Sequence, residues 1–427
     1  MMTPETTLYK MYLQILKEEL MPAMGCTEPI AIAYAAAKAK QLLADSVKSV
    51  KITVSGNIIK NVKSVIVPNT GGLKGISAAA AAGIVAGIPE KVLEVISQVS
   101  DEQKDDIRRF MQMIPFQIIP GEGEEQLDID ITLFSENSSV RVRISGSHTN
   151  IVLVVKDGVV LHESGKISTL AGPQLTDRSQ LRVEHIVEFA DQVQIEDVKE
   201  LLDRQIAYNW AIAEEGILHP YGASVGRTLL RMDGSSLKTQ AKAYAAAGSD
   251  ARMSGCELPV IINSGSGNQG ITASVPLIVY AKEKGIAQEK LYRALVLSNL
   301  IAIHQKTGIG RLSAYCGAVS AGCGAGCGIA YLEGADFRGI AHTLVNALAI
   351  VSGIVCDGAK PSCAGKIAAS VEAGIFGWQM FQNGQQFYGG DGIVSKGVEN
   401  TIYNVGRLGR IGMKETDKEI IRIMTDC

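Results

Sequence analysis

The chain is poor in aromatic residues and carries almost no excess of charge of either sign. Phe, Trp and Tyr make up 5% of its 427 residues, and 41 Lys and Arg nearly balance 44 Asp and Glu, for a formal net charge of −3. Nucleic-acid binding depends on a positive surface and, for single strands, on aromatic side chains that stack on bases. We therefore expect no nucleic acid and no anionic membrane surface as a partner.

The N-terminal segment lacks the positively charged start and apolar run of a signal peptide. Two uncharged stretches, 258–281 and 312–332, are long enough to span a bilayer, but Gly, Ser and Asn interrupt both. We predict that both stretches are buried elements of a cytoplasmic protein. In that reducing compartment the eight cysteines are expected to be free thiols, which are available to bind metal or to act in catalysis.

Small residues are abundant, with 45 glycines and several alanine runs, and hydrophobic residues reach 46%, enough for a large core. Helical spacing covers about 6–21, and an Ala-rich helix follows the loop MGCTEP. β-branched alternation with a Gly-Asn turn predicts a hairpin at 46–67, and five strand-like segments lie between 116 and 163. The rest of the chain has helical spacing with Gly-rich breaks.

This order of elements predicts an α+β protein. We expect a large all-helical catalytic domain formed by residues 1–45 and 171–427. A smaller α/β domain, a mixed sheet with helices, is expected as an insertion at 46–170. The sequence leaves the oligomeric state open, and small-residue helix faces are compatible with a homodimer.

Five cysteines fall between positions 316 and 363 in Gly-rich surroundings. Thiolates hold iron–sulfur clusters, and three ligands would leave one iron open to substrate. The spacing does not match a compact ferredoxin run or a zinc ribbon. The alternative is that these cysteines only fill tight helix packing as small apolar residues. Cys356 has the strongest context, because Asp357 follows it and Cys363 lies in the same loop.

Cys26 lies between two predicted helices, with Pro29 marking the start of the second one. A thiol near a helix N-terminus is expected to have a lowered pKa, which would suit a base or nucleophile. A half-buried turn cysteine without a chemical role is the alternative. Of the six histidines, His148 in SGSHTN has the most polar surroundings, whereas His304 is interpreted as a core residue.

Taken together, these motifs resemble a known family, the L-cysteine desulfidases (UPF0597), which is related to the iron–sulfur L-serine dehydratase alpha chain. The resemblance covers nearly the whole chain. It rests on MGCTEP, PNTGGLKG, SGSHTN, NSGSGNQG, HQKTGIGRLSAYCGAVSAGCGAG and VCDGAKPSCAGK, in this order. It implies a helical catalytic domain with a [4Fe–4S] cluster beside a smaller α/β domain.

The resemblance also implies roles for individual residues. It assigns the cluster ligands to Cys323, Cys356 and Cys363. Cys316 is an alternative to Cys323, because Cys316 and Cys356 have the same separation as Cys323 and Cys363. The family's catalytic cysteine corresponds to Cys26, and His148 stands in a Ser-His-Thr motif linked to proton transfer or substrate binding. A C-terminal cysteine that caps the open iron in some relatives would correspond to Cys427.

The implied reaction is α,β-elimination of L-cysteine to hydrogen sulfide, ammonia and pyruvate, with the cluster as Lewis acid. Two Gly-rich loops, PNTGGLKG and NSGSGNQG, are suited to binding a small carboxylate, since each precedes a predicted helix. The candidates for holding the substrate's carboxylate and amine are Asn69, Thr70, Asn263, Ser264, Ser266 and Asn268. The alternatives are an L-serine dehydratase, a non-catalytic iron–sulfur sensor, or a helical binding protein whose cysteines only pack. From the residues alone, a pyridoxal phosphate enzyme with a Schiff-base lysine also stays open.

Overall fold

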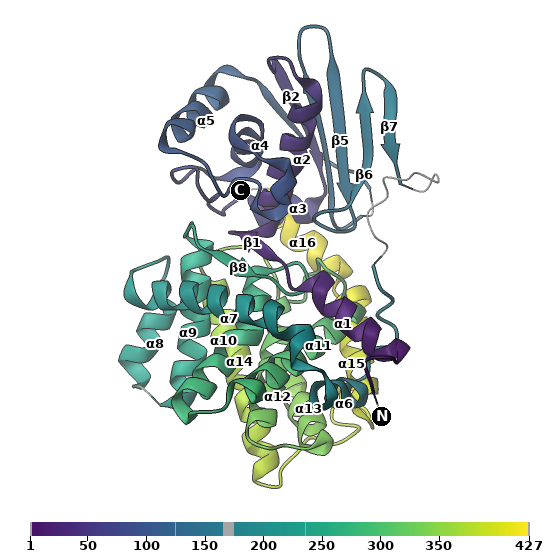
Figure 1. Cartoon of the computed structure of the whole chain (residues 1–427), viewed down its shortest axis with the longest axis vertical. Coiled ribbons are helices and arrows are strands. Elements are labelled where there is room, and N and C mark those ends of the chain that lie inside the picture. Colours follow the sequence, from purple (N-terminus) through teal and green to yellow (C-terminus); the bar gives the residue numbers. More distant parts are fainter. Residues whose placement is uncertain (1, 124, 165–174, 235, 426–427) are drawn as a thin grey trace.

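The computed structural model describes residues 2–123, 125–164, 175–234 and 236–425. It consists of two bodies, a sheet with helices on it and a larger bundle of helices, stacked along the long axis of the molecule (Figure 1). Between the last predicted strand and the helical remainder, the sequence also predicts a polar connector at about 164–180, which falls largely outside the described residues. The predicted class, α+β with a helical majority, is confirmed.

The larger sheet has six strands in the order β3-β2-β4-β5-β6-β7. They are β2 (Ser49–Val54), β3 (Phe116–Pro120), β4 (Asp128–Phe134), β5 (Ser139–Ser145), β6 (Ile151–Lys156) and β7 (Val159–Glu163). Only β2 and β3 pair in parallel, and every other neighbouring pair is antiparallel. The five strands predicted between 116 and 163 are therefore confirmed, and they form one mixed sheet with β2.

Helices cover one face of this sheet. α2 (Thr27–Leu43) packs on β4 and β5 and also against α4 (Gly75–Ala86), with the 3-10 helix η1 (Pro89–Glu94) and α5 (Asp101–Met113) beside them. Gly83 permits a close approach, because a Cβ there would lie 2.1 Å from the carbonyl oxygen of Ala33. The boundaries of the inserted domain, 46–170, stay a prediction. α2 lies before residue 46 in the sequence, yet it packs on the sheet of that domain.

The hairpin predicted at 46–67 is wrong. β2 ends at Val54, and α3 (Gly56–Val62) follows where the second strand was expected. Ser55 precedes α3 with extended backbone, and β2 takes β3 and β4 as partners instead of its own continuation. α3 buries Ile58 and Val62 together with polar residues at helical spacing, a pattern that strand-like alternation had concealed.

The second body is helical. Its N-terminal helix α1 (Thr7–Glu19) is capped by Thr6, close to the predicted limits. The others are α6 (Val183–Gln192), α7 (Ile195–Leu218), α8 (Val225–Asp233), α9 (Leu237–Met253), α10 (Gly267–Lys284), α11 (Gln288–Ile309), α12 (Gly317–Leu332), α13 (Phe337–Val351), α14 (Cys363–Gln382) and α15 (Val398–Arg407). A short π-helix, η2 (Leu408–Gly412), leads into α16 (Lys414–Thr425). None of the helices in the described part of the chain is long and apolar enough to cross a membrane.

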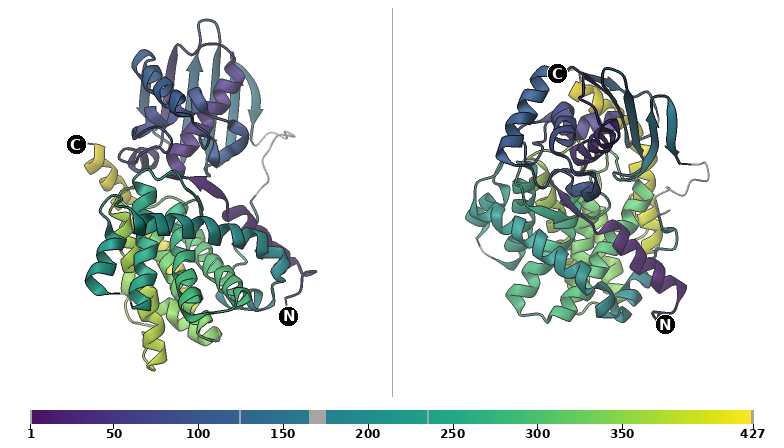
Figure 2. Two further views of the ribbon diagram at one scale, coloured as in Figure 1. Left: turned by 60° about the vertical axis from the view of Figure 1, so that its left-hand side comes forward. Right: turned by 45° about the horizontal axis from the view of Figure 1, so that its top comes forward.

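Two elements connect the bodies. β1 (Pro22–Met24) pairs with β8 (Pro259–Ile261) just before α2 begins, and α16 packs against α3 (Figures 1 and 2). These contacts bring the start of α2 and the whole of α3 to the end of the helical bundle at which α10, α12 and α14 begin. Several helix N-termini and loops therefore meet in one region.

Candidate active site

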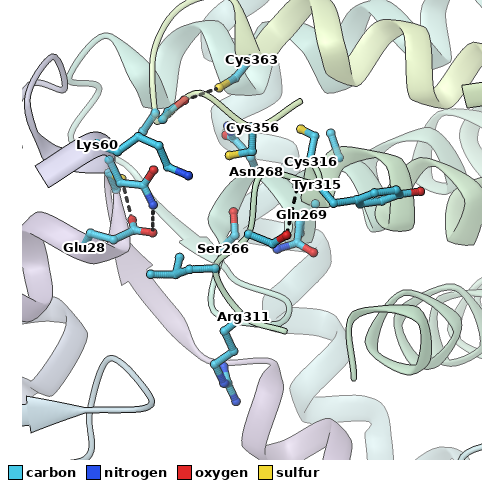
Figure 3. Close-up of a pocket in the computed structure, with 18 of the residues that line it drawn as sticks. Glu28, Lys60, Ser266, Asn268, Gln269, Arg311, Tyr315, Cys316, Cys356 and Cys363 are labelled. Atoms are coloured by element: carbon cyan, nitrogen blue, oxygen red, sulfur yellow. Dashed lines mark hydrogen bonds between the residues drawn. The ribbon is translucent and has the colours of Figure 1, made fainter. Parts of the chain in front are cut away.

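A cavity of about 100 Å³ lies in this region, between the two bodies. One water needs only about 10–15 Å³ on this measure, so a small molecule fits. Glu28 in the first turn of α2 and Lys60 on α3 lie on one side of the cavity (Figure 3). Cys26, directly before α2, also lines it. The helical bundle supplies the rest. The polar and thiol side chains that line it are Cys26, Glu28, Lys60, Asn61, Arg252, Ser266, Asn268, Gln269, Lys306, Arg311, Ser313, Tyr315, Cys316, Cys356 and Cys363.

Three cysteines of the cavity are brought together by local structure. Tyr315 and Val355 form an antiparallel bridge, so that Cys316 and Cys356, the residues that follow them, lie diagonally across it on one face. The backbone N–H of Cys316 donates to Ile354 O over 3.0 Å, and that of Cys356 to Ala314 O over 2.6 Å. Figure 3 shows both thiols in the same part of the cavity.

Cys363 joins them because α12 and α14 run parallel and begin side by side. Gly322 lies against Ser370 and Gly326 against Gly374, where an added Cβ on either Gly322 or Gly326 would come within 2.5 Å of the other helix. Cys316 directly precedes α12 and Cys363 is the first residue of α14. The small residues noted in the sequence thus place two of the thiols.

Cys323 lies elsewhere. It is fully buried two turns into α12, outside the residues that line the cavity. Burial raises the pKa of its thiol. For Cys316, burial and, to a smaller extent, the neighbouring Cys356 together raise the pKa to about 12. The structure therefore brings Cys316, Cys356 and Cys363 together and leaves Cys323 in helix packing. Cys427, predicted as a cap for the open iron, lies outside the described residues.

Cys26 is linked to a buried carboxylate. Its Sγ donates a hydrogen bond to Glu28 Oε2 over 2.9 Å, while Asn61 Nδ2 donates to Oε1 over 2.9 Å. His148 Nε2 lies 3.8 Å from the same Oε1. His148 is buried and is not among the residues that line the cavity. Its Nε2 has no hydrogen-bond partner among the described residues. Both residues predicted for proton transfer, Cys26 and His148, therefore flank Glu28.

The expected lowering of the Cys26 pKa is wrong. Cys26 does precede the first turn of α2, but burial and the carboxylate of Glu28 raise the pKa of its thiol well above the ordinary value. Burial alone would raise the pKa of the Glu28 carboxyl, but His148 and the hydrogen bond from Cys26 outweigh it and lower the pKa to about 2. The two shifts favour a protonated thiol at Cys26 next to a charged carboxylate at Glu28.

Four cationic side chains line the cavity. Arg252 and Lys306 are buried, and burial lowers the pKa of Lys306 to about 8. Lys60 forms an ion pair of 2.5 Å with Asp417 on α16, and Arg311 pairs with Glu19 over 2.8 Å. The cavity is therefore suited to a ligand with a carboxylate group.

The six residues predicted to hold substrate separate into two groups. Ser266 and Asn268 line the cavity, and Asn268 Oδ1 accepts a hydrogen bond of 3.1 Å from Arg252. The other four lie outside it. Asn69 donates to the backbone carbonyl of Ile96 and Thr70 to that of Val67. Asn263 donates to Asn299, and Ser264 donates to Asn263.

Comparison with known proteins gives the family. Residues 90–422 match the family model described as serine dehydratase alpha chain. The chain belongs to the serine dehydratase alpha-chain family. It is 62% identical to a UPF0597 protein of Desulfitobacterium hafniense, across 97% of this chain and 96% of that protein. Identity is 50% to a UPF0597 protein of Lachnoclostridium phytofermentans and 48% to one of Finegoldia magna, each covering 98% of this chain and all of the relative. The resemblance drawn from the motifs is confirmed.

An iron–sulfur cluster, which the family implies, fits the donor set of this serine dehydratase alpha-chain family member. Cys316, Cys356 and Cys363 direct three thiols to one cavity, and thiolate is the ligand that such clusters require. Among the described residues, no three Cys, His, Asp or Glu side chains are gathered closely enough for a single metal ion.

Sequence reasoning gave no role in the site to Glu28, Asn61 or Arg252, and it considered Lys306 only as a candidate Schiff-base lysine. Glu28 was within a quoted motif but was interpreted only as part of a helix start. Arg252 lies in the last turn of an Ala-rich helix that also carries Lys238, Lys242 and Asp250, so nothing in the sequence marks it as a site residue. Asn61 was hidden by the incorrect hairpin.

Proposed function

We propose that the chain is a carbon–sulfur lyase, an L-cysteine desulfidase, that works with a [4Fe–4S] cluster. One observation carries the proposal: Cys316, Cys356 and Cys363 line the same small cavity as Cys26. A cluster needs several thiols in one place, and elimination needs a group that exchanges protons beside it. The family match supports a lyase, and the cavity gives that chemistry a location.

Cys316, Cys356 and Cys363 would hold the cluster in this proposal. Cys316 takes the position that the resemblance gave to Cys323, because Cys323 lies in the packing between helices. When bound, a cluster with three protein ligands supplies an open iron as a Lewis acid for the soft sulfur leaving group.

The reaction consumes L-cysteine and water and gives hydrogen sulfide, ammonia and pyruvate. The α-proton leaves, the C–H electron pair becomes a C=C bond, and the Cβ–S bond breaks with the electrons going to sulfur. The sulfur takes up a proton, and the aminoacrylate that remains adds water and loses ammonia. Cys26 lies in the cavity and is the proposed acceptor of the α-proton, as a thiolate formed once its own proton has left along its hydrogen bond to Glu28. His148, across the same carboxylate, can hold the proton that Cys26 gives up.

L-Serine dehydratase activity is the second candidate, since the matching family carries that name. The same residues would then expel hydroxide. Anaerobically reconstituted protein should be supplied with L-cysteine and L-serine separately, and sulfide and pyruvate measured. The proposal predicts sulfide and pyruvate in equal amounts from L-cysteine, with much slower pyruvate formation from L-serine. Faster turnover of L-serine would favour the second candidate.

The roles of the cysteines can be separated in the same assay. Cys26→Ser should keep the brown visible absorption of the iron–sulfur cluster and lose turnover, whereas Cys356→Ser should lose both. A chromophore that needs four protein thiolates and ignores added L-cysteine would indicate a non-catalytic iron–sulfur protein instead.

A further inference from the structure

Glu28 differs from the other charged residues of the cavity. It is the one carboxylate among the described residues that line the cavity, where it faces four cationic side chains and four thiols. Only 7% of its surface is exposed. A buried carboxylate is costly unless a positive group or several hydrogen bonds compensate it.

No Lys or Arg in the described part of the chain forms an ion pair with Glu28. Its hydrogen-bond donors in the cavity, Cys26 and Asn61, are both neutral, and His148 stays at 3.8 Å. Of the cations that line the cavity, Lys60 pairs with Asp417, Arg311 pairs with Glu19, and Arg252 donates to Asn268. The carboxylate therefore faces the cavity with no Lys or Arg of the described residues paired to it, and His148 is a positive partner only when its ring is protonated.

Asn61 adds a second acceptor beside it. Its Nδ2 donates to Glu28, but its Oδ1 is buried and has no hydrogen-bond partner among the described residues. Asn61 is 6% exposed and lines the cavity. An unpartnered buried acceptor next to a buried carboxylate is suited to a donor with several N–H groups.

Arg252 provides a donor for a negatively charged group, as Glu28 and Asn61 provide acceptors for a positively charged one. It is 2% exposed and lines the cavity, and its Nε has no hydrogen-bond partner among the described residues, while one terminal nitrogen donates to Asn268. Gly267 leaves room for this guanidinium, because a Cβ there would lie 2.3 Å from Nε. A free N–H on a buried guanidinium is a strong donor to a carboxylate.

From this arrangement we propose that Glu28 and Asn61 bind the α-ammonium group of the substrate and that Arg252 binds its α-carboxylate. The inference rests on the proposed function and names the polarity with which an α-amino acid enters the cavity. The ammonium would lie beside Cys26, which places the α-carbon next to the thiol. The side chain of the amino acid would then extend toward Cys316, Cys356 and Cys363. This makes the α-ammonium group a requirement for tight binding.

The test uses two ligands that cannot undergo elimination. L-Alanine has both charged groups, and propionate lacks only the ammonium. Binding of each to the anaerobically reconstituted full chain is measured by titration calorimetry, up to the solubility limit of the ligand. The wild type should bind L-alanine at least about tenfold more tightly than propionate, the range of one or more charge-assisted hydrogen bonds. Glu28→Gln should weaken the binding of L-alanine by about tenfold or more and leave the affinity for propionate unchanged. Glu28→Asp should restore part of the affinity for L-alanine. Arg252→Gln should weaken both ligands.

Three results would overturn the inference: no binding of L-alanine to the wild type, an equal loss for both ligands in Glu28→Gln, or no loss for either. An equal loss is what a merely structural role of Glu28 predicts. Because no bond breaks in this experiment, its outcome is separate from that of the sulfide assay. Glu28-dependent binding of L-alanine without sulfide release would contradict the proposed function and leave the inference standing.

Discussion

The thiol of Cys26 donates a hydrogen bond to Glu28 over 2.9 Å, and both side chains are buried at the start of α2. Burial and the adjacent negative charge raise the pKa of the thiol, so the helix N-terminus does not decide its protonation. A positive group that reached Glu28 would remove much of that effect. The protonation state of Cys26 is thereby linked to what occupies the cavity.

Glu28→Gln should lower the pKa of Cys26, since the substitution removes a like charge next to the thiolate. Alkylation of Cys26 by iodoacetamide, followed by mass spectrometry of its peptide across pH, should show a midpoint at lower pH than in the wild type. Glu28→Asp keeps the charge and serves as the control, with little change expected. An unchanged or higher midpoint in Glu28→Gln would show that Glu28 does not control this thiol.

Glu28 should also contribute to the acid dependence of stability. Its pKa falls from 4.5 unfolded to about 2 in the fold, so its contribution is present above pH 4.5 and disappears as the pH falls toward 2. At about 1.4 kcal/mol per pKa unit, this amounts to roughly 3 kcal/mol at neutral pH.

Urea unfolding of the wild type and Glu28→Gln between pH 7 and pH 3 measures this contribution. The difference in the free energy of unfolding between the two should shrink below pH 4.5. Glu136→Gln, a change at an exposed carboxylate, is the control and should show no such trend. A constant difference for Glu28→Gln over the whole range would contradict the assigned pKa shift.

The ion pair between Lys60 and Asp417 should hold α16 against α3. It measures 2.5 Å, and Asn57 donates to the same carboxylate over 2.8 Å. Asp417→Asn leaves the ammonium of Lys60 buried without its charge partner, which costs about 3–5 kcal/mol. Hydrogen exchange of residues 414–425 should accelerate, while Glu415→Gln, which removes an exposed pair on the same helix, should change little. Equal protection of α16 in both variants would rule out this role.

The sequence was sufficient for elements whose apolar spacing is regular. The helix from Thr7 and the strands between 116 and 163 follow from it, as do the helices after both Gly-rich loops. α3 could not be predicted in this way, because its Gly-Asn start also signals a hairpin turn and its polar residues are buried by tertiary contacts.

Within the site, the limits of sequence reasoning have a geometric cause. Equal separations made Cys316 and Cys323 interchangeable in sequence, and only the bridge between Tyr315 and Val355 distinguishes them. Polar residues such as Asn69 and Thr70 were suited to a ligand by type, but both are buried outside the cavity and donate to backbone carbonyls. Which polar groups remain unpartnered, as in Asn61 and Arg252, becomes visible only once the helices are packed.

The identity of the third thiolate tests the central claim most directly. Cys316→Ser, just before α12, and Cys323→Ser, within α12, are matched changes. Both variants should be reconstituted anaerobically with iron and sulfide, and the iron bound per chain should be measured. If Cys316, Cys356 and Cys363 hold the cluster, Cys316→Ser loses most of its iron and the visible absorption, whereas Cys323→Ser retains both. Full iron content in Cys316→Ser together with its loss in Cys323→Ser would contradict the account.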